Sequence, residues 1–161
     1  MSNTYTKLVK LQEVEFYKIA CVNNISPRIV DCSPVKDGLY ELTTCRYPET
    51  LYDVMADKNR REESLLIISQ ARDLIRKLHS IGILHNDLSE ENIVYDKTTS
   101  SVAIIDFGLS RYIDSITSDE IPSMVENLYE GVQYATISSC GIEYLLSVEL
   151  GILAFLESAF H

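Results

Sequence analysis

The sequence predicts an α+β fold in which a small N-terminal part, made of one helix and a β-hairpin, precedes a larger and mostly helical part. Three observations predict it. The chain has 161 residues, 46% of them hydrophobic and 24% charged, which is typical of one globular domain. Residues 63–81 have the clearest helical periodicity of the chain. Two apolar stretches, 92–95 and 102–105, flank a short polar turn, as in a second β-hairpin.

The N-terminal elements follow from the spacing of apolar residues and from turn residues. Apolar side chains at near-helical intervals predict a helix over 8–22. An extended segment at 28–32 and a strand at 39–45 are separated by a Pro- and Gly-containing turn at 34–38, which predicts a hairpin. A short helical piece is expected at 50–55.

The C-terminal part is predicted to be helical around the second hairpin. The helix at 63–81 has acidic residues near its start and basic residues near its end, as the helix dipole favours. Residues 111–125 are polar and predict a loop, and two further helices are expected at 124–135 and 141–159. The last helix is apolar around most of its circumference but contains Glu143, Glu149 and Glu157. We expect it to be buried within the chain or to form a partner or homodimer interface, and not to span a membrane.

The charge of the chain excludes several classes of partner. Lysine and arginine total 14 and aspartate and glutamate total 24, which gives a net charge of −10. An acidic domain is repelled by nucleic acid and by anionic membranes, so we expect direct binding to neither.

Residues 1–10 lack the apolar core of a signal peptide, and we therefore expect a cytoplasmic protein.

One stretch of the sequence has the residue types needed for phosphate chemistry. It reads Leu-His-Asn-Asp-Leu-Ser-Glu-Glu-Asn over 84–92, followed by Ile-Ile-Asp-Phe-Gly over 104–108. Asp87 and Asn92, in a loop between a helix and a strand, can converge on one point, and Asp106 ends a buried strand directly before a phenylalanine and a glycine. Carboxylate and amide oxygens suit Mg²⁺ that carries phosphates, which leaves Asp87 to hydrogen-bond an acceptor hydroxyl. These residues could alternatively serve only as cap and turn residues.

This pair of segments resembles the protein-kinase-like superfamily. HNDLSEEN is similar to the kinase catalytic loop H-R-D-L-x-x-x-N, and IIDFG is similar to the D-F-G segment. Within the superfamily the loop most resembles small atypical kinases, such as the kinase of the tRNA threonylcarbamoyladenosine machinery. Its H-N-D variant is also similar to the loop of some kinases of large DNA viruses. Such a viral kinase would act in the host cytoplasm. The resemblance implies a truncated kinase domain over 1–161, with a residual N-lobe at 1–46 and a C-lobe at 47–161.

The resemblance also implies roles for individual residues around the cofactors ATP and Mg²⁺. Asp87 matches the catalytic aspartate, Asn92 acts in catalysis and in metal binding, and Asp106 matches the second metal ligand. His85 matches the histidine that packs against the D-F-G backbone.

Five further residues match positions that hold or surround the nucleotide. Glu13, or with weaker support Glu15, matches the glutamate of the kinase ion pair. Arg46 and Tyr47 lie in the segment that resembles the adenine-contacting hinge, Arg46 to Glu49. Phe107 and Gly108 complete the D-F-G match, and the packing of Phe107 would set the active or inactive state.

The departures from the kinase pattern leave two functions open. The chain has no G-x-G-x-x-G segment and no recognisable lysine strand, and Lys7 and Lys10 stand too close to Glu13 for the usual strand-to-helix path. Asn86 replaces the arginine that reads an activating phosphate. The chain is therefore expected to be a serine/threonine kinase acting on a protein substrate, or a catalytically inactive kinase mimic that binds and regulates a partner kinase. A small-molecule phosphotransferase of the aminoglycoside type is a third reading.

Overall fold

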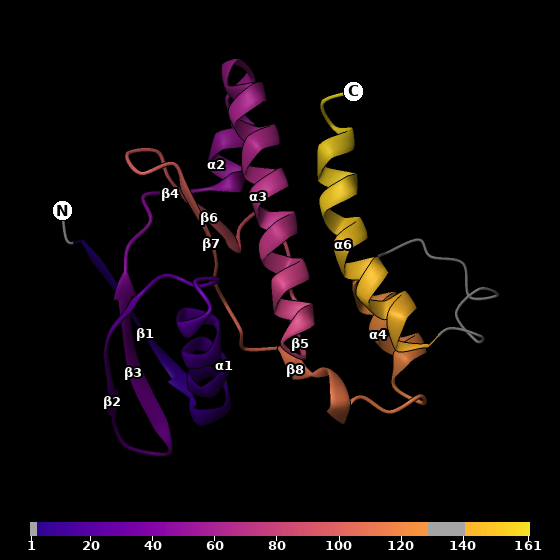
Figure 1. Cartoon of the computed structure of the whole chain (residues 1–161). Helices are drawn as coiled ribbons and strands as arrows, with labels where there is room; N and C mark the ends of the chain where they lie inside the picture. Colours follow the sequence, from indigo (N-terminus) through magenta and orange to yellow (C-terminus); the bar gives the residue numbers. More distant parts are fainter. Residues whose placement is uncertain (1–2, 129–140) are drawn as a thin grey trace.

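The N-terminal part is a three-stranded antiparallel sheet with one helix packed against it. In the computed structural model, which describes residues 3–128 and 141–161, the sheet has the order β1 (Thr4–Lys10), β3 (Leu39–Cys45), β2 (Ile29–Pro34). Helix α1 (Leu11–Val22) follows β1 without a connecting loop. Figure 1 shows α1 beside this sheet, on the side that faces the rest of the molecule.

The predicted β2–β3 hairpin is confirmed, but the helix predicted over 8–22 is wrong at its start. Residues 4–10 pair with β3 along its whole length, from Thr4 opposite Cys45 to Lys10 opposite Leu39. Leu8, which looked like the first apolar residue of a helix, is 60% exposed on this strand. The pairing with β3 therefore decides the conformation of this segment over its local helical spacing.

The chain then enters the C-terminal part through a short strand and two helices. These are β4 (Glu49–Thr50), α2 (Leu51–Ala56) and, after a 3₁₀ turn, α3 (Arg61–Ser80). The buried residues of α3 recur at helical spacing along one stripe: Ser64, Ile67, Ile68, Ala71, Ile75 and Leu78. In Figure 1, α3 runs through the centre of the molecule, so this stripe organises the main core.

Short strands on either side of the loop at 85–92 hold that loop in place. Strand β6 (Ile93–Asp96) pairs with β7 (Ser101–Ile104), as predicted, and with β4. Strand β5 (Ile83–Leu84) pairs with β8 (Arg111–Tyr112). The loop predicted over 111–125 is therefore only partly correct.

Helix α4 (Ile121–Leu128) also begins within that predicted loop. Its residues Ile121, Met124 and Val125 are buried in a second apolar cluster together with Leu84 and Leu145. The remainder of the helix expected at 124–135, from residue 129 onward, lies outside the described residues.

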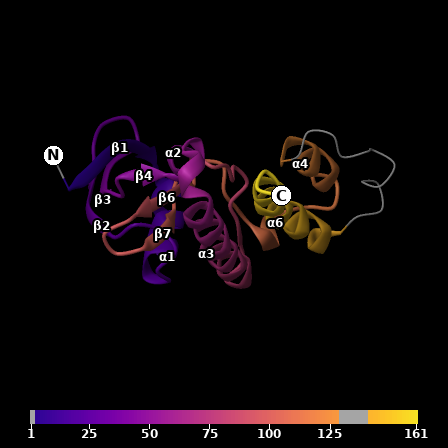
Figure 2. The ribbon, with the colours of Figure 1, turned by 90° about the horizontal axis from the view of Figure 1, so that it is seen from above.

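Helix α6 (Ile142–Ser158) confirms the predicted C-terminal helix and lies between α3 and α4, as Figure 2 shows from above. One face is buried through Leu145, Glu149, Leu153 and Leu156, whereas Phe155 is 60% exposed. Burial within the chain thus accounts for one side of this helix, and the expected homodimer contact through the other side stays a prediction. No helix in the described part of the chain is long and apolar enough to cross a membrane.

Candidate active site

The loop over 85–92 is fixed by a fully buried histidine. The Nδ1 atom of His85 accepts a hydrogen bond from the Asp87 amide at 3.2 Å, and Nε2 lies 2.8 Å from the Ile105 carbonyl oxygen. Because Nδ1 accepts, Nε2 carries the proton and donates to Ile105. The ring therefore ties the loop that contains Asp87 to the residue directly before Asp106.

Asp87 and Asn92 lie together in this loop. The Asn92 amide nitrogen Nδ2 donates to the Asp87 carbonyl oxygen at 2.8 Å, which leaves the Asn92 Oδ1 oxygen available to a ligand. Partial burial raises the pKa of the Asp87 carboxyl, and the negative charge of Asp106 raises it further, against the opposing effects of His85 and of the Asn92 hydrogen bond. A carboxylate with a raised pKa is a stronger proton acceptor once it is ionised.

Asp106 stands in an unusual backbone conformation that its neighbours stabilise. Its φ is +64°, a left-handed value that costs a non-glycine residue about 1 kcal/mol or more. Its amide donates to the Tyr17 hydroxyl at 2.8 Å, and its Oδ1 accepts from the Gly108 amide at 3.3 Å. Phe107 is buried between the Tyr17 and His85 rings, with centroid distances of 4.8 and 5.2 Å.

A lysine from β1 joins this group, which corrects the expectation that no strand lysine is present. The Lys7 Nζ atom lies 2.6 Å from Glu13 Oε2 and 3.9 Å from Asp106 Oδ1. The pair forms because α1 begins directly after β1, so strand and helix meet without the longer path we expected. Glu15 is exposed, and Glu13 is therefore the glutamate of this cluster.

Gly108 provides the space for this cluster. A Cβ atom at position 108 would lie 3.2 Å from Glu13 Oε1 and 3.3 Å from Asp106 Oδ1, closer than most real Cβ contacts. The glycine after Phe107 therefore lets two carboxylates and one ammonium group share a small volume.

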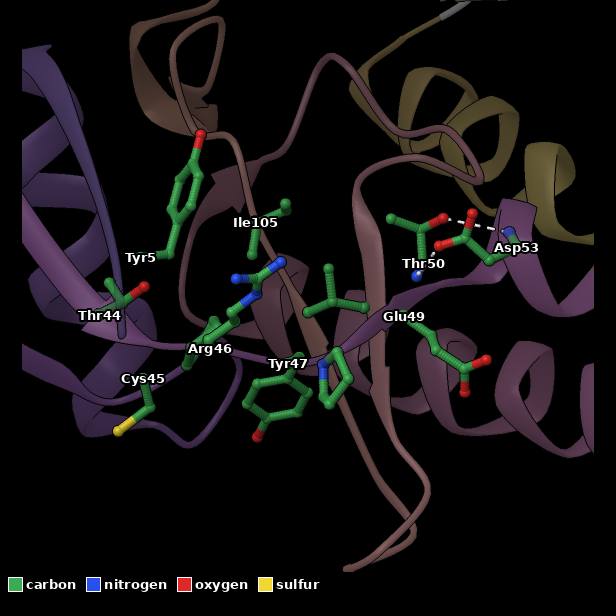
Figure 3. A pocket seen from close by; sticks show the side chains of 12 residues that line it. Tyr5, Thr44, Cys45, Arg46, Tyr47, Glu49, Thr50, Asp53 and Ile105 are labelled. Carbon is green, nitrogen blue, oxygen red and sulfur yellow. Dashed lines mark hydrogen bonds between the residues drawn. The ribbon is translucent and has the colours of Figure 1, made fainter. Parts of the chain in front are cut away.

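A cavity of about 350 Å³ opens where the N-terminal sheet meets the C-terminal part (Figure 3), and Ile105, the residue directly before Asp106, is part of its lining. The segment after β3 forms one wall, including the two predicted hinge residues, Arg46 and Tyr47. Val94 and Ile105 contribute apolar side chains. Such a volume lies within the range of about 300–1,000 Å³ that small-molecule sites occupy.

Glu149 on α6 is a site residue that sequence reasoning missed. Its side chain is fully buried and accepts hydrogen bonds from the backbone amides of His85 (3.0 Å) and Asn86 (2.7 Å) and from His79 Nε2 (2.8 Å). Burial alone would raise the pKa of this carboxyl, but the His79 hydrogen bond and charge and the Asn86 amide hold it below its usual value. The available signal was a charged residue in the apolar middle of the helix, between Val148 and Leu150, since buried charges require partners.

The backbone conformation at position 86 favours asparagine over the arginine that the kinase pattern has there. Its φ is +71°, and asparagine tolerates this left-handed conformation better than most residues. Its side-chain amide donates to the Leu109 carbonyl oxygen at 3.0 Å. A neutral contact therefore joins the loop at 85–92 to the chain that follows Gly108.

The oxygen atoms present suit a magnesium ion that is also held by phosphates. Asn92 Oδ1 is available, and the Asp106 side chain is 42% exposed beside Asp87. Within residues 3–128 and 141–161, no group of three or more His, Cys, Asp or Glu side chains is arranged to hold a metal alone. Mg²⁺ commonly binds through one or two side chains together with substrate phosphates, and this donor set fits that mode.

The similarities of the chain to known proteins agree with this arrangement. It is 32% identical over 89 residues to the serine/threonine-protein kinase pim-2 of Danio rerio, covering 53% of this chain and 29% of that protein. It is 33% identical over 111 residues to the serine/threonine-protein kinase kin-29 of Caenorhabditis elegans, covering 65% of this chain and 13% of that protein. The chain thus spans less than a third of the length of these curated relatives.

A solved structure and a family model extend the similarity over most of the chain. The fold is similar to that of the Cydia pomonella granulovirus kinase PK-1, with a TM-score of 0.58 and 20% identity, over 94% of this chain and 60% of that one. The protein kinase domain model matches residues 11–134. The expected protein-kinase-like fold is confirmed, and the chain belongs to the protein kinase domain family.

Proposed function

We propose that this chain is a Mg²⁺-dependent ATP:protein phosphotransferase that acts on serine or threonine hydroxyl groups. The observation that carries the proposal is the meeting of Lys7, Glu13 and Asp106, with Nζ–O distances of 2.6 and 3.9 Å, beside Asp87. Phosphoryl transfer depends mainly on positioning and on electrostatic stabilisation. A lysine held by a glutamate next to a metal-ligating carboxylate supplies both.

ATP would occupy the cavity and extend toward the charged cluster. The adenine would lie against the wall formed by Arg46 and Tyr47, with the phosphates directed toward Lys7. Asn92 and Asp106 would hold Mg²⁺, which would supply positive charge to offset the negative charge that develops during transfer.

Asp87 would act on the acceptor. Its carboxylate accepts the proton of the serine or threonine hydroxyl as the hydroxyl oxygen bonds to the γ-phosphorus. The bond between that phosphorus and the bridging oxygen breaks, and ADP leaves with the electron pair. The raised pKa of Asp87 supports this role because it makes the Asp87 carboxylate a stronger base toward the serine or threonine hydroxyl.

The second candidate is a catalytically inactive kinase mimic, and the absence of a phosphate-covering G-x-G-x-x-G segment from these 161 residues favours it. The sequence contains no G-x-G-x-x-G segment, and in the described part of the chain β1 pairs on one side only, with β3. A mimic would bind a kinase or its substrate through the same surface. It would have no physical need for Asp87, Asn92 and Asp106 together.

Transfer of labelled phosphate from ATP to a mixed serine- and threonine-containing protein substrate tests the proposal. We expect Asp87→Asn to reduce the rate by about a hundredfold or more, the range for loss of a general base, and to leave ATP binding intact. Asp73→Asn, at a carboxylate that is 77% exposed on α3, is the matched control and should retain full activity. Transfer that persists in Asp87→Asn, or wild-type protein that binds ATP and transfers nothing, would contradict the proposal, and the second result supports the mimic.

A further inference from the structure

Tyr5 lies on the face of β1 that is directed toward the candidate site. Side chains two residues apart on a strand share a face, and on this face Val9 is buried and Lys7 contacts Glu13. On the opposite face, Thr6 contacts Thr43 through their hydroxyl groups, and Leu8 is exposed. The alternation therefore directs the Tyr5 ring toward the cavity.

The Tyr5 ring lines this cavity but is poorly covered by the protein. The residue is 55% exposed although it forms part of the cavity wall. In Figure 3 the side chains of Tyr5 and Ile105 both lie above the end of the Arg46 side chain in this view, with Tyr5 to the left. An aromatic face that is open to a cavity offers a large contact surface to a flat ligand.

The distance between Tyr5 and Lys7 along the strand is similar to the distance between the base and the phosphates of one nucleotide. Two residues along a strand correspond to about 7 Å, so the aromatic ring and the ammonium group are neighbours on the same face. A base placed on Tyr5 would direct its phosphates toward Lys7 and Asp106, with only the ribose between them. Val94 and Ile105, which line the same cavity, offer apolar surface to the base.

We propose that Tyr5 stacks on the base of the bound nucleotide and holds it against Val94 and Ile105. The inference rests on the proposed function, because it assigns a nucleotide to this cavity. These 161 residues contain no glycine-rich segment that could cover the nucleotide. The Tyr5 ring, on β1, covers the base instead. Since every base has a π-face, this contact contributes affinity without reading base identity.

Calorimetric titration of Mg²⁺-ATP into Tyr5 variants tests the contact. We expect Tyr5→Phe to bind like wild type and Tyr5→Ala to bind about tenfold more weakly, as for loss of one base–aromatic stack. GTP should lose affinity by a similar factor. The melting temperature of Tyr5→Ala without nucleotide should stay close to that of wild type, since the ring is mostly exposed.

A fluorescence measurement reports the contact directly, because the chain contains no tryptophan. In a Tyr5→Trp variant, stacking should quench the indole emission saturably as ATP is added. Leu8→Trp, at a 60% exposed position on the opposite face of the same strand, is the control for absorption by ATP. It should show no saturable quenching.

The outcomes separate this inference from the function on which it rests. Equal or tighter ATP binding by Tyr5→Ala would overturn the stacking role while wild-type binding still supports the kinase proposal. An indole in Tyr5→Trp that ATP does not quench, despite measured binding, would overturn it as well. Wild-type protein that binds no nucleotide would overturn both proposals.

Discussion

Glu149 shows how one buried carboxylate can organise the loop at 85–92 from a distant part of the sequence. It accepts hydrogen bonds from two backbone amides of the loop and from one histidine, and in the described part of the chain those amides have no other acceptor. A carboxylate can only accept hydrogen bonds, so all three donors are satisfied by its two oxygen atoms. Glu149 is therefore a positioning residue, which acts through the loop backbone and does not line the cavity.

Replacing Glu149 by glutamine should weaken both the fold and the loop. The substitution replaces one carboxylate oxygen by an NH₂ group, which then faces one of the three hydrogen-bond donors. We therefore expect the free energy of unfolding, measured in urea, to fall by about 3 kcal/mol. The transfer rate should fall about tenfold to a hundredfold because Asp87 is displaced, whereas the dissociation constant for ATP should hardly change.

Glu157→Gln is the control for that prediction. Glu157 lies two turns further along α6 and pairs with Arg72 at 2.5 Å, near the surface, with 35% of its side chain exposed. Loss of such a solvent-screened pair should lower stability much less than loss of the buried Glu149 contacts. If both substitutions had the same small effect, the anchoring role of Glu149 would be refuted.

At the scale of elements, the segment from β8 to α4 depends on an exposed ion pair. Arg111 donates to both oxygens of Glu120, at 3.1 and 3.2 Å, and the Thr117 amide donates to one of them at 2.8 Å. The hydrogen bond from Arg111 and then that from Thr117 lower the pKa of Glu120 from 4.5 to about 2. This carboxylate therefore stabilises the folded state only while it is ionised.

The sign of that shift predicts a pH dependence for the folded protein. A lowered folded-state pKa means that the stabilisation is complete above about pH 4.5 and is lost as pH falls toward about 2. The difference in melting temperature between wild type and Glu120→Gln should be constant from pH 6 to 7 and should shrink below pH 4.5. A difference that grows on acidification would show that Glu120 does not have this role.

Most elements could be predicted from local pattern, and the errors have one common cause. The hairpins and α3 could be predicted because their apolar residues recur at the positions that the fold buries and because turn residues separate the strands. Residues 8–10 were misread as helix because Leu8 and Leu11 fit a helical pattern although both side chains are exposed. Strand β1 exists because of its pairing with β3, which no pattern within those residues reveals.

At the scale of the whole molecule, the candidate site lies where the two parts of the chain meet. Lys7 and Glu13 come from the N-terminal part, and Asp87, Asn92 and Asp106 come from the C-terminal part. The motif in the sequence was sufficient to indicate the last three. Lys7 and Glu149 could not be assigned, because one depends on the junction of β1 with α1 and the other on how α6 packs beside the loop.

The binding of ATP in the presence and absence of Mg²⁺, measured by calorimetry, tests most directly whether these two parts form a nucleotide site. We predict saturable binding by the wild-type protein that requires Mg²⁺ and that is lost in Asp106→Asn, a variant of nearly the same shape without the charge. Absence of binding, or binding that neither the metal nor the substitution changes, would contradict the account.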